Sequence, residues 1–322
     1  MRAVRIHATG GREVIQIDAV PVPNPGAGEA LVRMEAVGVN FIDIYHRTGQ
    51  YRVDMPFTLG QEGAGVVERV GTGVAEVHPG DRVAFSNVDR SYADYVAAPA
   101  WRLVPVPADL TAEQAAAAML QGMTAQYLAS ATYPIRAGET ALVHAAGGGV
   151  GQLLVQMIKR RGGRVIATVS SEAKAAVARS AGADEVINYS QVDFAAEVAR
   201  LTNGGGVAVV YDSVGRDTFE RSLDCAALRG MVVLFGQASG RVGPFDPQVL
   251  NAKGGLFLTR PSLHLYTHTR AELLQRAADV LGGVADGSLR LRIDRTFPLD
   301  EAAEAHGYLE SRHATGKLLL IP

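Results

Sequence analysis

The sequence predicts an α/β protein in which a doubly wound parallel sheet follows a β-rich part of the chain. From residue 139 onward, short apolar segments alternate with amphipathic segments of helical period. That alternation is typical of a parallel sheet with helices on both faces. Before residue 105, strand-like segments are separated by frequent turn signals such as Pro79-Gly80-Asp81-Arg82, which favours a compact β unit.

The elements can be assigned in chain order. The first part contains strand-like segments at 30–37, 63–71 and 83–85. A helix is expected to begin after Thr111, because threonine caps helices and Gln114 lies three positions further on, before an alanine-rich run. The alternating part is expected to have strands at 140–146, 164–169, 185–188, 207–212 and 231–235, and helices at 150–161, 172–181, 193–202 and 217–227. After about residue 265 the alternation ends, with a helix expected at 271–283 and a last strand at 317–321.

Bulk composition restricts the class of protein. A chain of 322 residues with 48% hydrophobic and 20% charged residues is typical of a globular protein of two domains. The formal net charge of −2 gives no basic field for nucleic acid or an acidic membrane. The single cysteine, Cys225, cannot form an internal disulfide, which favours a reducing compartment. Because we find neither a signal-peptide core nor an 18-residue apolar run, we expect a cytoplasmic protein.

A glycine-rich loop lies where a predicted strand becomes a predicted helix, at His144-Ala145-Ala146-Gly147-Gly148-Gly149-Val150-Gly151. Glycines there permit a tight turn and a close approach of the backbone to a pyrophosphate, and the helix N-terminus favours negative charge. We therefore expect Gly147, Gly148, Gly149 and Val150 to cradle a dinucleotide in a Rossmann domain. A tight turn without a ligand is the alternative.

The end of the second strand indicates which dinucleotide binds. A site for NAD usually has Asp or Glu there, to bind the ribose 2′-hydroxyl. This strand ends in Val169-Ser170-Ser171, and Lys174 follows closely. Hydroxyl groups and a lysine suit a 2′-phosphate, so NADPH is predicted. A solvated helix face is the alternative for Lys174.

Several motifs together identify a family resemblance. They are Asn40-Phe41-Ile42-Asp43, the run 59–65 (LGQEGAG), Gly80-Asp81-Arg82-Val83, the glycine loop, Tyr211-Asp212-Ser213-Val214-Gly215 and the C-terminal GKLLLIP. The chain resembles the medium-chain dehydrogenase/reductase superfamily over nearly its whole length, and within it the zinc-independent, zeta-crystallin-like NADPH:quinone oxidoreductases. The resemblance implies a GroES-like catalytic domain at 1–123 and 265–322, a Rossmann domain binding NADP at 124–264, a reaction in the cleft between them, and a homodimer.

Zinc alcohol dehydrogenases of this superfamily carry a Cys near the position of Asn40 and a His at that of Gln61. An amide at both positions lacks the thiolate and imidazole of a catalytic zinc site, so no metal is expected. His264 and His268 could share a helix face, but two residues do not complete a site. Quinones and enones are electron-poor and can accept a hydride without a Lewis acid.

The candidate residues fall into two sets. The resemblance implies that Asn40, Tyr45 and Tyr51 line the nicotinamide and substrate pocket, with Gln61 available for a hydrogen bond. Half-buried packing is the alternative for the tyrosines, a structural amide is that for Gln61, and His46 is expected to be an exposed loop residue. The candidates for cofactor binding are Asn40, Thr124, Gly147, Gly148, Gly149, Val150, Ser170, Lys174, Tyr189, Ser213, Val214, Phe235, Gly236, Arg260 and Lys317; plain surface charge is the alternative for the last two.

The predicted function is NADPH-dependent, zinc-independent reduction of a quinone, by hydride or electron transfer. Two alternatives remain open from the sequence: reduction of an enone or alkenal double bond, and a protein that binds NADPH without catalysis.

Overall fold

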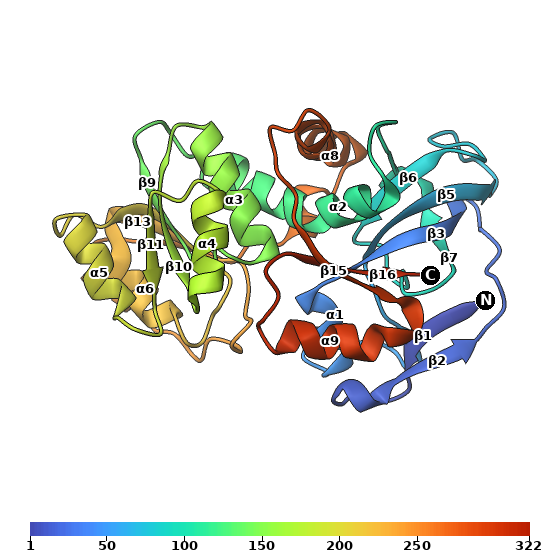
Figure 1. Cartoon of the computed structure of the whole chain (residues 1–322), viewed down its shortest axis with the longest axis horizontal. Helices are drawn as coiled ribbons and strands as arrows, with labels where there is room; N and C mark the ends of the chain where they lie inside the picture. The colour runs from blue at the N-terminus through green and yellow to red at the C-terminus, as the bar shows by residue number, and fades with distance from the viewer. The chain divides into compact units, whose positions relative to one another are not determined.

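The computed structural model describes all 322 residues, which divide into two compact units. Unit 1 comprises Met1–Met123 and Thr267–Pro322, and unit 2 comprises Thr124–Tyr266. In Figure 1, unit 1 is coloured blue to cyan at the start of the chain and red at its end, and unit 2 is coloured green to orange. No helix is both long enough and apolar enough to cross a bilayer.

Unit 2 is built on a six-stranded sheet in which every neighbouring pair is parallel. The strands are β9 (Thr140–Val143), β10 (Arg164–Val169), β11 (Glu185–Asn188), β12 (Val207–Asp212), β13 (Ala226–Leu234) and β14 (Phe257–Thr259). Their order in space, β11-β10-β9-β12-β13-β14, is that of the Rossmann fold. The order reverses between β9 and β12, and ligands of such sheets bind at the carboxyl ends of the strands at this switch point.

Helices cover both faces of this sheet. They are α3 (Gly149–Arg160), α4 (Glu172–Ser180), α5 (Phe194–Leu201), α6 (Phe219–Cys225) and the short α7 (Gln248–Ala252). In Figure 1 the sheet is seen nearly edge-on, with α3 and α4 on one side and α5 and α6 on the other. Five of the six residues of β10 are buried, as expected for a parallel strand covered on both faces. The sheet is therefore the middle layer of unit 2.

The predicted strands at 164–169, 185–188, 207–212 and 317–321 are confirmed at the same bounds. The strand predicted at 140–146 is three residues too long, because the chain leaves the sheet after Val143 and Ala145 adopts a φ of 51°. The helix predicted at 217–227 is also too long: α6 ends at Cys225, and β13 begins at once with Ala226 paired to Val207.

Unit 1 contains two sheets. The larger has the strand order β15-β16-β3-β5-β6-β8, with β7 also paired to β3, and the smaller has the order β2-β1-β4. The strands are β1 (Arg2–Ile6), β2 (Ile15–Ala19), β3 (Glu29–Val39), β4 (Phe57–Thr58), β5 (Glu62–Val70), β6 (Arg82–Ser86), β7 (Tyr95–Pro99), β8 (Val104–Pro105), β15 (Ile293–Pro298) and β16 (Lys317–Ile321). Strands from both ends of the chain share one sheet, because β16 pairs antiparallel with β3. This arrangement agrees with the predicted β-rich, GroES-like part.

The helices of this part are α1 (Phe41–Arg47), α2 (Ala112–Tyr127), α8 (Arg270–Ala285) and α9 (Ala302–Glu310), with α2 continuing into unit 2. Short 3-10 turns lie at Arg12–Val14, Ala100–Arg102, Leu263–Tyr266 and Leu299–Glu301, and a π-helical turn at Leu128–Thr132 follows α2. The helix start predicted at Thr111 is confirmed by a capping box. The Thr111 N–H donates to Gln114 Oε1 at 2.9 Å, and the Gln114 N–H donates to Thr111 Oγ1 at 3.2 Å.

Candidate functional site

The glycine loop of unit 2 joins β9 to α3 at the switch point of the sheet. Gly148 is the N-cap of α3, and its N–H donates to Ala145 O at 2.9 Å. The N–H groups of Gly149 and Val150, the first two helical residues, have no acceptor within the helix. A Cβ at Gly147 would lie 2.9 Å from the carbonyl oxygen of Lys174, and one at Gly151 would lie 2.4 Å from that of Ala145. The loop is therefore a close-packed turn with a helix N-terminus, suited to a pyrophosphate.

The residues predicted for the adenosine end lie around this loop. Strand β10 is followed by Ser170, and the neighbouring β11 by Tyr189, whose N–H donates to Val169 O at 3.1 Å. The Ser171 hydroxyl accepts from the Lys174 N–H at 3.4 Å and so caps α4. The close approach of Lys174 to Gly147 places the first turn of α4 against the glycine loop. Ser170, Lys174 and Tyr189 therefore lie at one end of the sheet, with no carboxylate at the tip of β10.

The segments after β12 and β13 are also in contact. A Cβ at Gly236 would lie 2.4 Å from Ser213 O, so the two backbones touch. The Phe235 N–H donates to Asp212 O at 2.8 Å, and the Ser239 hydroxyl donates to Val214 O at 2.8 Å. The four predicted residues of these segments, Ser213, Val214, Phe235 and Gly236, thus belong to one surface at the carboxyl ends of the strands.

The structure does not indicate a role for two further candidates of unit 2. Arg260 follows β14, is exposed, and donates to the carbonyl of its neighbour Pro261 at 3.1 Å. Thr124 is a buried residue of α2, 8% exposed. Neither has a contact in the structure that gives it a particular role.

In unit 1, Asn40 belongs to a buried cluster with Glu62 and Lys317. The Asn40 amide nitrogen donates to Glu62 Oε2 at 2.8 Å, and Lys317 Nζ donates to Asn40 Oδ1 at 2.7 Å. Lys317 and Glu62 form an ion pair, and neither side chain is exposed. Glu62 Oε1 accepts the N–H of Leu120. Glu62 is thus the centre of the cluster, although it is not among the predicted site residues.

The contacts in this cluster restrict the side chain of Lys317 and the residue type at position 38. The Lys317 ammonium is buried and paired, so the surface-charge alternative for it was wrong. A Cβ at Gly38 would lie 2.1 Å from Glu62 Oε2, so only glycine leaves room for the ion pair beside β3. Removing one partner of a buried pair is costly, since it leaves the other charge uncompensated. In the sequence, Glu62 is a carboxylate with glycines on both sides of it in an apolar segment. This pattern could have indicated a buried charge at position 62.

The aromatic candidates lie in helix α1 and in the loop that follows it. The rings of Tyr45 and Tyr51 meet edge to face at 5.5 Å between centroids; Tyr45 is 9% exposed and Tyr51 is half-buried. His46 was expected to be an exposed loop residue, but it is a helical residue only 6% exposed. Its ring packs on Phe57 at 5.4 Å, and burial lowers its pKa. The expectation failed because His46 belongs to a helix, where its ring packs against Phe57 and Tyr51.

Gln61 lies just before β5, and its amide donates to Asp89 Oδ1 at 2.6 Å. Its side chain is half-buried and so remains partly accessible. No group of three or more His, Cys, Asp or Glu side chains is placed to hold a metal ion.

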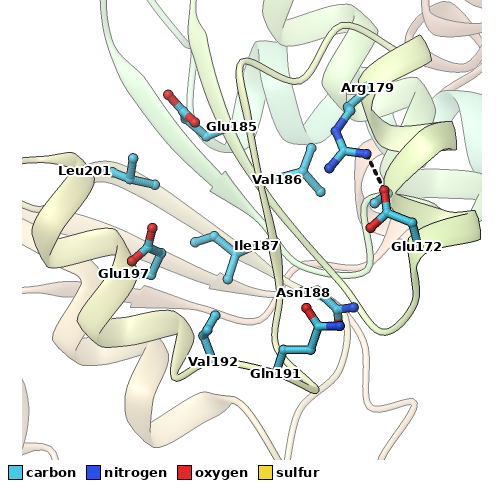
Figure 2. Close-up of a pocket in the computed structure, with 11 residues that line it drawn as sticks. Glu172, Arg179, Glu185, Val186, Ile187, Asn188, Gln191, Val192, Glu197 and Leu201 are labelled. Carbon is cyan, nitrogen blue, oxygen red and sulfur yellow. Dashed lines mark hydrogen bonds and ion pairs between the residues drawn. The ribbon is translucent and has the colours of Figure 1, made fainter.

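A pocket of about 280 Å³ lies at the outer edge of the unit 2 sheet, over β11 and between α4 and α5 (Figure 2). It is lined by Glu172, Ala175, Arg179, Glu185, Val186, Ile187, Asn188, Gln191, Val192, Glu197 and Leu201. Arg179 pairs with Glu172 at 2.6 Å across its rim. None of the predicted site residues lines this pocket, so it adjoins the adenosine end without being part of it.

Two family descriptions match the chain: an alcohol dehydrogenase GroES-like domain at residues 26–108, and a zinc-binding dehydrogenase at residues 149–275. A quinone oxidoreductase of Pseudomonas aeruginosa is 44% identical over 100% of this chain and 99% of its own length. Quinone oxidoreductase 1 of Escherichia coli is 42% identical over 99% of both chains. The chain belongs to the quinone oxidoreductase family of the medium-chain dehydrogenases/reductases.

Solved structures of family members agree with this assignment. A mycobacterial relative complexed with NADPH is 45% identical and superimposes with a TM-score of 0.97 over 100% of both chains. The Escherichia coli quinone oxidoreductase complexed with NADPH is 41% identical, with a TM-score of 0.98 over 100% of both chains. A 2-haloacrylate reductase of Burkholderia is 41% identical over 99% of this chain and 98% of its own length, so the family also includes a protein named for a different acceptor.

Proposed function

We propose that this protein reduces quinones with NADPH, with no zinc in the reaction. The observation that carries the cofactor assignment is the end of β10, where Ser170 and Ser171 stand in place of an acid and Lys174 packs against the glycine loop. Full-length relatives named quinone oxidoreductase, and relatives solved with NADPH, support the same conclusion.

The residues of unit 2 fit this dinucleotide. The N–H groups of Gly149 and Val150 at the start of α3 would bind the pyrophosphate, since backbone donors and the helix dipole favour anions there. Ser170, Lys174 and Tyr189 would hold the adenosine end with its 2′-phosphate, and the segments at Ser213–Val214 and Phe235–Gly236 would contact the rest of the cofactor. When bound, the nicotinamide supplies the hydride.

The residues of unit 1 are suited to an electron-poor acceptor. Tyr51 is half-buried and touches the buried Tyr45, so the pair offers an aromatic surface and phenolic donors for a flat carbonyl compound. The Asn40 amide is held on both its atoms by Glu62 and Lys317, so we assign it a fixed position at the start of α1. Gln61 can donate from a half-buried position. The proton that completes the reduction would come from water or a tyrosine hydroxyl.

The assembly and location belong to the same proposal. We propose a cytoplasmic homodimer in which residues 1–123 and 265–322 form the catalytic domain and 124–264 bind NADPH. Support for a dimer comes from β14, an edge strand of the unit 2 sheet that carries Phe257, 59% exposed. An open apolar edge is a ready template for pairing with a second copy.

The deciding experiment measures NADPH oxidation with 1,4-benzoquinone, 9,10-phenanthrenequinone and an aliphatic enone, before and after treatment with a chelator. We expect turnover with the quinones that the chelator does not affect. Silence on both quinones, or activity that depends on stoichiometric zinc, would contradict the proposal. Tight NADPH binding without oxidation by any acceptor would indicate a protein without catalysis.

One observation favours a second candidate, reduction of a conjugated double bond. The 2-haloacrylate reductase is as similar to this chain as the quinone oxidoreductases of enteric bacteria. A 2-haloacrylate and an aliphatic enone therefore belong in the same panel, and a higher kcat/KM for either of them than for the quinones would favour this candidate.

A further inference from the structure

Five buried polar side chains are linked at the switch point of the unit 2 sheet; four of them form a chain of hydrogen bonds, and the fifth, Thr218, also donates to Asp212 Oδ2 at 2.8 Å. Thr168, Asp212 and Ser222 are 0% exposed, and His144 is 1% exposed. His144 Nδ1 lies 2.8 Å from Thr168 Oγ1, and His144 Nε2 lies 3.0 Å from Ser222 Oγ. The Ser222 hydroxyl donates to Asp212 Oδ2 at 2.9 Å. The predicted site includes none of these residues.

The direction of each hydrogen bond follows from the chemistry. A carboxylate only accepts, so the Ser222 proton points to Asp212, and the other bond of Ser222 must be one that it accepts from His144 Nε2–H. Burial lowers the pKa of His144, so the ring is neutral and Nδ1 accepts from the Thr168 hydroxyl. The bonds run one way, from Thr168 through His144 and Ser222 to Asp212.

This chain of bonds lies between two segments of the proposed cofactor site, and Asp212 itself holds one of them. Asp212 Oδ1 accepts the N–H groups of Val214 at 2.8 Å and Gly215 at 3.0 Å, which fixes the turn after β12. His144 is the first residue after β9, and its own N–H donates to Tyr211 O at 3.0 Å. The Ala146 N–H donates to the carbonyl of Thr168 at 3.1 Å, so the entry to the glycine loop is tied to β10.

We infer that His144, Thr168, Ser222 and Asp212 are positioning residues for the cofactor, because their one-way hydrogen-bond chain holds the glycine loop and the 213–215 turn at a fixed spacing. None of them needs to touch the dinucleotide. Preorganised loops lose less conformational freedom on binding, so the chain of bonds would contribute to cofactor affinity. This inference rests on the proposed NADPH site.

Two variants remove one link each. Thr168→Val keeps the shape of the side chain and deletes the donor to Nδ1, and Ser222→Ala deletes the acceptor of Nε2–H. A buried polar group left unpaired is costly, and we expect the dissociation constant of NADPH, measured by its fluorescence, to rise about tenfold in each. At saturating NADPH, kcat and the KM for the quinone should be unchanged, because no reacting atom is touched.

Two controls separate positioning from general destabilisation. Thr168→Ser keeps the hydroxyl and should restore most of the affinity. Leu256→Ala removes a buried side chain of the same core just before β14, at the amino end of that strand; it should lower Tm without changing NADPH affinity. If Leu256→Ala weakens NADPH binding as much as Thr168→Val at an equal loss of Tm, or if both link variants bind NADPH like the parent, the inference is wrong.

A measurement without cofactor keeps the two proposals apart. Nitrogen-15 NMR of the unliganded protein should show His144 neutral with its proton on Nε2, and Ser222→Ala should shift that resonance. If the parent protein fails to bind NADPH, the proposed function fails. If it binds NADPH but His144 carries its proton on Nδ1, this inference alone is overturned.

Discussion

The Asn40–Glu62–Lys317 cluster shows how single residues define the site of unit 1. The family resemblance places Cys and His of zinc dehydrogenases at the positions of two amides of this chain, and both amides have protein partners: Asn40 with Glu62 and Lys317, and Gln61 with Asp89. The Lys317 ammonium supplies the positive charge beside Glu62. The residue types at 40 and 61 could be interpreted from sequence, whereas the buried partner of Glu62 lies 255 positions away and could not.

Lys174 is predicted to contact the 2′-phosphate of NADPH. Replacing it with alanine should weaken NADPH binding by roughly 1.5–3 kcal/mol, since a charge-assisted contact to the 2′-phosphate is lost. NADH, which lacks that phosphate, should bind almost as before. Fluorescence titration of both cofactors measures the difference, with Lys159→Ala, which removes an ion pair with Asp184, as the control. Equal weakening of NADH and NADPH by Lys174→Ala would rule out the phosphate contact.

Asp43 makes the stability of unit 1 depend on pH. Burial raises its pKa from 3.8 to about 7, against the lowering effects of the Asn40 N–H, the Tyr92 hydroxyl and the charge of Lys317; Glu62 raises it further. Because the folded state binds this proton more tightly than the unfolded chain, stability falls as pH rises from about 4 to about 7 and then levels off.

The variant Asp43→Asn removes this titration, while its amide oxygen can still accept from Asn40 and Tyr92. Between pH 5 and pH 8 we expect the free energy of unfolding of the parent to fall by about 2–3 kcal/mol more than that of the variant. Urea unfolding at the two pH values measures this difference, in which the other titrating groups cancel. Parallel pH profiles would show that Asp43 is ionised throughout.

At the scale of elements, the prediction succeeded where local chemistry decides the outcome. Strands β10, β11, β12 and β16 have the predicted bounds because each is a short apolar run ended by a polar or turn residue. The predicted boundary of β9 was wrong because the apolar character continues through Ala145 and Ala146 while the backbone turns. The early start of β13 could not be predicted, since it depends on pairing Ala226 with the distant Val207.

The close contact between the ends of β12 and β13 is expected to matter for both stability and NADPH binding. Gly236→Ala would place a methyl group 2.4 Å from Ser213 O and must push the two segments apart. Overpacking of this kind costs about 1–3 kcal/mol, so we expect a lower Tm together with weaker NADPH binding. Gly243→Ala is the matched control in the same connection, because its Cβ would meet nothing within 4 Å. A Gly236→Ala protein with unchanged NADPH affinity would contradict a role of this contact in the site.

At the scale of the whole molecule, the fold class was accessible from sequence because it depends on periodicity and on whole-chain resemblance. The parallel alternation predicted the Rossmann unit, and the turn-rich first part predicted the β unit. What the sequence could not provide is spatial order, such as the pairing of β16 with β3 or the meeting of His144, Thr168 and Ser222. Those contacts join residues far apart in the chain, and no local pattern encodes them.

The open edge of β14 is the interface that we propose for the dimer. Strand β14 pairs with β13 on one side only, and it presents Phe257 at the open edge, while Leu228 in β13 is 73% exposed. A two-fold axis beside β14 would pair two copies of this strand antiparallel and bury both apolar residues, as an isologous interface requires. Phe257→Lys places a charge at that edge, so we expect a monomer by size-exclusion chromatography with light scattering. Ile17→Lys changes an equally apolar, exposed residue of unit 1 and should remain dimeric. A Phe257→Lys protein that stays dimeric would move the interface away from this edge.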